Sequence, residues 1–205
     1  MSNAMQELVE YFAREFGPVD ENVYSELVFD WPPIVVHRVP PSPQHPFTTL
    51  FTSGMGETNQ DSAHANEPRL RCELFMQLCP DWPLDNQAIE SLDNRWPIEY
   101  LKELARIPHL SHNWVDAPVG VFANESKADV LSPKSRYTGS FVFAERSFQR
   151  SDGDTVQLYR VTPLYWEELE LVSTSGLPAL LQAFDRDNIP FVVSPSRPNV
   201  ALAAG

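Results

Sequence analysis

Apolar positions along the chain recur with two periods, and these periods predict a mixture of helices and strands. A period of 3.6 residues predicts helices at residues 5–16, 97–108, 162–172 and 178–187. Short apolar runs predict strands at residues 34–39, 47–52, 70–78, 139–148, 155–161 and 189–193, with a weaker one near 114–122. The polar stretches 57–68 and 124–138 are expected to be loops.

Glycine and proline residues set the expected ends of these elements. Gly17-Pro18 follows the first helical stripe, as a cap followed by a helix breaker would. Pro97 suits a first helical turn, Pro108 is expected to stop that helix, and Thr162-Pro163 is expected to open the next. Asp152-Gly153-Asp154 separates two apolar runs and predicts a β-hairpin. Both runs are apolar on both faces, so these strands should be central and covered on both sides.

The order of the elements predicts the fold class α+β, with a mixed central β-sheet packed by helices. We expect one domain over residues 5–194 and a loose tail over residues 195–205. Residues 1–4, before Met5, have the character of an expression-vector scar.

The charge of the chain limits its partners. Its 205 residues carry a formal net charge of -13, so a nucleic-acid partner is not expected, whereas a basic protein would be attracted. No apolar run is long enough to span a membrane, and no leader opens the chain, so we expect a cytoplasmic protein. Cys72 and Cys79 should then be reduced thiols that do not bridge each other.

The turn Ser53-Gly54-Met55-Gly56-Glu57 is a candidate for chemistry, but it fits no catalytic pattern. A phosphate loop would need more glycines and a lysine, and a nucleophile elbow needs Gly-x-Ser-x-Gly. The glycines are better explained by backbone dihedrals that a side chain would forbid.

Titratable residues give no stronger signal. Among the five histidines only His109 and His112 lie close together, and zinc needs three or four ligands. The carboxylate pairs Glu167-Glu168 and Asp152/Asp154 have structural explanations, at a helix start and a turn. We therefore expect no enzyme, cofactor or metal, with a hydrolase-like use of His109, His112 and a nearby carboxylate as the alternative.

Three stretches together resemble the suppressor of fused family. They are TLFTSGMGE at 49–57, CELFMQL at 72–78 followed by WPIEYLKELAR at 96–106, and VQLYRVTPLYWEELELVSTSGLPALLQAF at 156–184. Their order and spacing extend the resemblance from about Phe47 to Val193.

The resemblance implies a suppressor of fused-like domain that binds proteins. Larger animal members hold a zinc-finger transcription factor of Hedgehog signalling by pairing a peptide strand between two domains, and this chain looks like the first domain only. In animal members a Gly-Asp-His segment contributes an acid to peptide binding. The corresponding stretch of this chain is Asp116 to Gly120, and Asp116 lies near the matching position of that acid but not at it. Binding of the same peptide is therefore not expected.

Single-domain members of the family are mostly bacterial, and many resemble immunity proteins of toxin systems. The leading hypothesis is a non-enzymatic immunity or antitoxin-type protein that neutralises a basic toxin partner. Its candidate partner-binding groups are a sheet edge and the residues Glu57, Asp61, Trp114 and Asp116. A regulatory domain that works fused to others is a further alternative.

Overall fold

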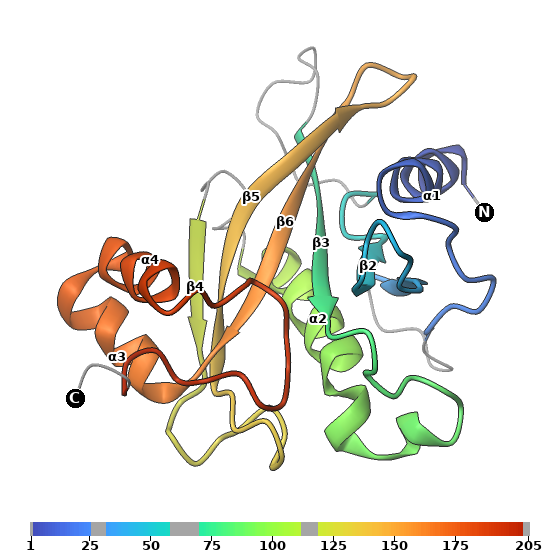
Figure 1. Cartoon of the computed structure of the whole chain (residues 1–205). Coiled ribbons are helices and arrows are strands. Elements are labelled where there is room, and N and C mark those ends of the chain that lie inside the picture. The colour runs from blue at the N-terminus through green and yellow to red at the C-terminus, as the bar shows by residue number, and fades with distance from the viewer. Residues whose placement is uncertain (1, 26–31, 58–69, 112–118, 203–205) are drawn as a thin grey trace.

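A six-stranded mixed sheet forms the centre of the computed structural model, which describes residues 2–25, 32–57, 70–111 and 119–202 (Figure 1). The strand order is β1-β2-β3-β6-β5-β4. The strands are β1 (Val35–Val39), β2 (Thr48–Ser53), β3 (Leu70–Leu78), β4 (Val119–Ala123), β5 (Gly139–Gln149) and β6 (Thr155–Leu164). Neighbours are antiparallel except β3 and β6, which run parallel. The α+β class with a mixed central sheet is therefore confirmed.

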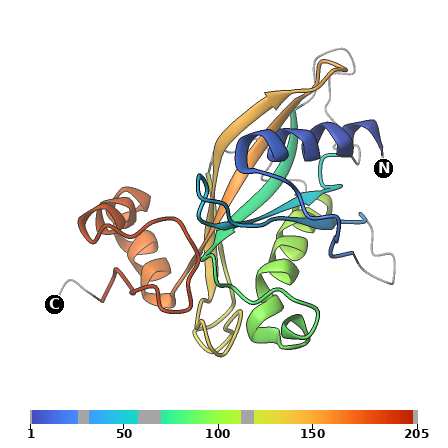
Figure 2. The same ribbon diagram turned by 45° about the vertical axis from the view of Figure 1, so that its right-hand side comes forward.

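Helices cover the two faces of the sheet. α2 (Leu92–Ser111), preceded by the short 3-10 turn η1 (Ala88–Glu90), packs on one face through Trp96, Leu101 and Leu104. The opposite face carries α1 (Asn3–Phe16) over β1–β3 and the pair α3 (Trp166–Ser175) and α4 (Leu177–Arg186) over the other end. Figure 2 shows α1 and α2 on opposite sides of the sheet.

The first helix forms as its apolar stripe predicts. Leu8, Phe12 and Phe16 are buried, and the ring of Phe12 stacks on Phe51 of β2. The helix ends at Gly17, whose φ of 121° is a conformation that glycine adopts without strain. Ser2 caps the other end, since its hydroxyl accepts a hydrogen bond from the Met5 N–H.

Two prolines do not act as expected. Pro108 does not end α2, which runs from Leu92 to Ser111, because the proline lies in the last turn and is itself buried. Thr162 and Pro163 belong to β6, and α3 begins only at Trp166. Pro163 lies beyond the part of β6 that pairs with β3, so that ladder does not need the N–H that proline lacks.

Two other expectations need correction. Residues 189–193 form no strand: Val193 makes a single bridge to Leu78, and Pro190 lies three residues before it. The hairpin of β5 and β6 is confirmed, and β6 is central and buried. β5 is buried only over its first four residues; in its far half, exposed residues alternate with residues that contact α1, where Phe148 stacks on Tyr11 and Arg146 pairs with Glu15.

The segment after residue 195, expected to be loose, packs against the domain as far as Val200. Arg197 and Val200 are buried, and both Glu168 oxygens accept from the Arg197 guanidinium at 2.8 and 2.6 Å. The same carboxylate accepts from the N–H groups of Tyr165 and Val200. One buried ion pair therefore caps α3 and holds the C-terminal segment.

Replacing Arg197 with Met should lower the free energy of unfolding by about 3–5 kcal/mol, because Glu168 would stay buried without its counter-ion. Denaturant unfolding measures this. Arg186→Met is the matched control: Arg186 makes an exposed pair with Asp187, which should contribute little. Equal losses in the two variants would contradict the assigned importance of the buried pair.

Candidate functional site

The two edges of the sheet differ in how far they are covered. At β1, Tyr24 bridges Val36 through backbone hydrogen bonds of 2.9 and 3.1 Å, and the Asp20 N–H donates to the Arg38 carbonyl. At β4, residues 119–123 pair with β5, and no strand within the described parts of the chain pairs with the other side. Such an edge presents unpaired N–H and C=O groups to another chain.

A groove lies beside this open edge. Its volume is about 390 Å³, and it is lined by Tyr100, Glu103, Leu104 and Ile107 of α2 and by residues 121–124 of β4 and the loop after it. The hydroxyl of Tyr100 donates to Ser140 of β5 at 2.9 Å, which fixes the helix against the sheet. Burial raises the pKa of Tyr100, so the phenol stays neutral.

The surface next to the groove combines apolar and acidic side chains. Val121 is 42% exposed at the centre of β4. Glu99 and Glu103 are exposed on α2, four positions apart and therefore on the same side of the helix. The groove can thus accept an apolar side chain while its rim attracts a positive charge.

The residues predicted as partner-binding are not brought together by the described structure. Glu57 follows β2, which three strands separate from β4, and it forms an ion pair with Arg150 of the β5–β6 turn at 3.1 Å. Asp61, Trp114 and Asp116 lie outside the described residues. In the sequence, Trp114 and Asp116 directly precede β4.

The residues of the enzymatic alternative form no described cluster. His109 lies in α2, whereas His112 is outside the described residues. In the parts of the chain that the structure describes, no three His, Cys, Asp or Glu side chains are grouped to hold a metal. Cys72 and Cys79 are not joined in a disulfide, as expected.

The glycine turn has a role that the sequence did not reveal. It encloses the buried carboxylate of Glu73 in β3, which accepts from the Thr52 hydroxyl at 2.7 Å and from the Gly54 and Gly56 N–H groups at 3.0 Å. Gly54 has φ of 110°, and a Cβ there would collide with the Pro33 carbonyl oxygen. The turn thus holds an internal carboxylate with backbone donors.

The chain matches known proteins in family and fold. A family model described as Suppressor of fused protein matches residues 30–198. A suppressor of fused homologue from Neisseria gonorrhoeae FA 1090 has a similar structure, with TM-score 0.62 and 13% identity over 97% of this chain and 94% of that chain. Among curated proteins, none matches the sequence significantly.

Two further solved structures are similar. Drosophila Suppressor of Fused has TM-score 0.64 and 14% identity over 98% of this chain, which matches only 51% of that chain. A structure described as the complex of Sufu with Fu has TM-score 0.61 and 14% identity, over 98% of this chain and 92% of that chain. The described residues include no helix long and apolar enough to cross a membrane.

Glu73 should make stability depend on pH. Burial raises its pKa from 4.5 to about 7, although Thr52, Gly56 and Gly54 hydrogen bonds oppose the rise. Between these pH values the folded protein keeps a proton that the unfolded chain has lost. The free energy of unfolding should therefore fall by about 3 kcal/mol through this window and stay low at pH 8.

Glu73→Gln removes this titration. Urea unfolding at pH 5.5 and pH 8 should therefore show that the free energy of unfolding of the variant rises relative to that of the native protein as pH rises. Burial lowers the pKa of His37 to about 4, so below pH 6.5 the unfolded chain binds a proton that the folded protein does not. This lowers the free energy of unfolding equally in both proteins and therefore cancels when the two are subtracted. If the difference in free energy of unfolding between the two proteins did not change with pH, the raised pKa assigned to Glu73 would be refuted.

Proposed function

The chain belongs to the suppressor of fused family, and we propose that it is a non-enzymatic protein-binding module that captures a partner segment along β4. The observation that carries this proposal is the edge of β4 beside the α2 groove, with which no strand of the described residues pairs. The structure described as a Sufu–Fu complex supports it by analogy, since that homologue assembles with another protein.

The binding mode that fits this edge is strand addition. An extended segment of the partner would hydrogen-bond to the backbone of β4, and alternate side chains would point toward the α2 side. The groove of about 390 Å³ offers space for one of them, between Leu104 and Ile107 of the helix and Phe122 of the strand. Main-chain pairing would give affinity and the groove would select the side chain.

We further propose that the partner is basic and that the protein is of the immunity type, neutralising a toxin in the bacterial cytoplasm. The net charge of -13 and the exposed Glu99 and Glu103 support a basic partner, because complementary charge speeds encounter and disfavours wrong partners. The thiols of Cys72 and Cys79, not joined in a disulfide, fit a reducing compartment.

A lysine on the open edge should block partner binding. Affinity purification from the native cell identifies the partner, and its binding to variants is then measured by titration. Val121→Lys should weaken the affinity about tenfold or more, because a charged side chain on an edge disfavours addition of another strand. Val23→Lys is the matched control, since Val23 is 43% exposed and Val121 42%. Equal affinity of the two folded variants would exclude the β4 edge.

Binding of this partner should also weaken between ~50 mM and ~500 mM salt, because screening shortens the reach of the acidic surface. Glu103→Gln should reduce both the affinity and its salt dependence. An affinity that does not change with salt would remove the electrostatic part of the proposal and leave strand addition to be judged by Val121→Lys.

A further inference from the structure

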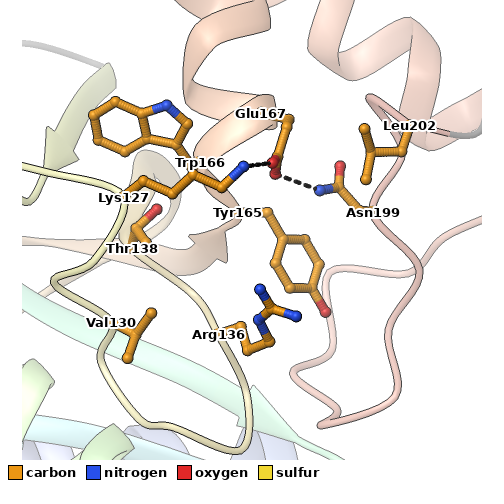
Figure 3. A pocket seen from close by; sticks show the side chains of 9 residues that line it. All are labelled: Lys127, Val130, Arg136, Thr138, Tyr165, Trp166, Glu167, Asn199 and Leu202. Carbon is orange, nitrogen blue, oxygen red and sulfur yellow. Dashed lines mark hydrogen bonds and ion pairs between the residues drawn. The ribbon is translucent and has the colours of Figure 1, made fainter.

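A second cavity, of about 310 Å³, lies where the loop after β4, the start of α3 and the C-terminal segment meet. Figure 3 shows the side chains that line it: Lys127, Val130, Arg136, Thr138, Tyr165, Trp166, Glu167, Asn199 and Leu202. None of these residues belongs to the β4 groove. The volume is that of a cavity for a small ligand or a single side chain.

The charges in this cavity leave one cation without a counter-ion. Glu167 forms an ion pair with Lys127 and accepts from the Asn199 amide at 2.8 Å, and these donors, Lys127 first, lower its pKa. Arg136 is exposed, and none of the ion pairs between described residues includes it. Among the described residues that line the cavity, Lys127 and Arg136 are cations and Glu167 is the one carboxylate, which gives this lining a net charge of about +1 in a chain whose formal net charge is -13.

Arg136 lies at the cavity with its backbone in an unfavourable conformation. Its φ is 60°, and the other described non-glycine residue with positive φ is Asn188, a residue type that tolerates it. The loop around Arg136 is braced, because its N–H donates to the Ser132 carbonyl at 2.9 Å and the Leu131 N–H donates to the Tyr137 carbonyl at 2.7 Å. Strain of this kind persists where surrounding structure enforces it, and it is frequent at binding sites.

The aromatic wall opposite Arg136 is also fixed. The Arg197 guanidinium lies 4.7 Å from the ring centre of Tyr165, and the Tyr165 hydroxyl donates to the Arg197 carbonyl at 2.6 Å. Burial raises the pKa of Tyr165, so the phenol stays uncharged and does not repel an anion. The buried Glu168–Arg197 pair therefore keeps this wall in place before any ligand arrives.

From these features we propose that the cavity binds a carboxylate attached to a short apolar group. The guanidinium of Arg136 pairs with the carboxylate, because its planar donors match the two oxygens. The apolar part lies against Val130, Tyr165 and Leu202. This inference rests on the cavity alone and is independent of strand addition at β4.

The test is an NMR titration of the full chain with sodium hexanoate, with acetate and hexylamine as matched probes. Hexanoate should shift the amide signals of residues 127–138 and 165–167 and reach saturation. Acetate should bind more weakly because it lacks the apolar part, and hexylamine should not bind because its charge has the wrong sign. Equal binding of hexanoate and hexylamine, or shifts only outside these residues, would overturn the proposal.

Variants separate Arg136 from its surroundings. Arg136→Gln should weaken hexanoate binding about tenfold or more, since a charge-assisted pair is lost. Lys134→Gln is the matched control, because Lys134 is an exposed cation of the same loop that does not line the cavity. Unchanged binding in Arg136→Gln, or equal loss in both variants, would overturn the assignment of Arg136.

Two more substitutions exclude a merely structural role. Arg136→Gly should abolish binding while the melting temperature stays equal or rises, because glycine adopts a φ of 60° without strain. Glu167→Gln should tighten hexanoate binding several-fold, because it removes the only carboxylate among the described residues that line the cavity and releases Lys127. Weaker binding in Glu167→Gln would contradict an anion site.

Discussion

The parallel pairing of β3 with β6 is the constraint on which the rest of the structure depends. Six residue pairs, from Leu70↔Thr155 to Phe75↔Arg160, join two antiparallel halves into one sheet. Parallel strands cannot be joined by a tight turn, so a long crossover must separate them, and here it contains α2, β4 and β5. Because β5 and β4 then add beyond β6, β4 becomes the far edge. The open edge at β4 is thus a consequence of this pairing.

Side chains reinforce the same junction. The Arg160 guanidinium in β6 donates to Gln77 of β3 at 2.9 Å and to Glu145 of β5 at 3.0 Å, and it lies 4.8 Å from the ring centre of Phe75. One arginine therefore links three adjacent strands. At the other end of the junction, Arg71 of β3 pairs with Asp154 of the hairpin turn at 2.9 Å.

The sequence predicted elements whose signals are local, and it failed where tertiary context decides. The stripe of α1, the Asp-Gly turn and the runs of β1, β2 and β3 all have short-range signatures, and each was confirmed. Pro108 and Pro163 were misread because the cost of a missing N–H depends on which hydrogen bond the neighbouring structure requires there. The anchoring of Arg197 depends on Glu168, a partner 29 residues away, which no local pattern reveals.

The candidate sites were predicted in part for the same reason. The attribution to a backbone dihedral was correct for Gly54, as its φ shows, but Gly56 has no positive φ and is instead closely approached by Arg71 and Cys72 of β3. The role of both N–H groups as donors to Glu73 needs the fold. One signal was available: Glu73 is the only acid in the apolar run 70–78, and a buried acid requires hydrogen-bond partners. In the structure, the glycine turn at residues 53–57 supplies two of the hydrogen-bond donors that this acid requires.

Net charge describes this surface less well than the positions of individual charges. Unit charges on an exposed surface interact weakly beyond about 8 Å at physiological salt. A total of -13 therefore does not prevent a local site of the opposite sign. Beside β4, Glu99 and Glu103 are exposed, so the local field agrees with the total. In the second cavity Lys127 and Asn199 already engage Glu167, so Arg136 sets the local field. The same chain can thus attract a basic protein at one face and hold a carboxylate at another, because each ligand responds to the few charges within its own screening length.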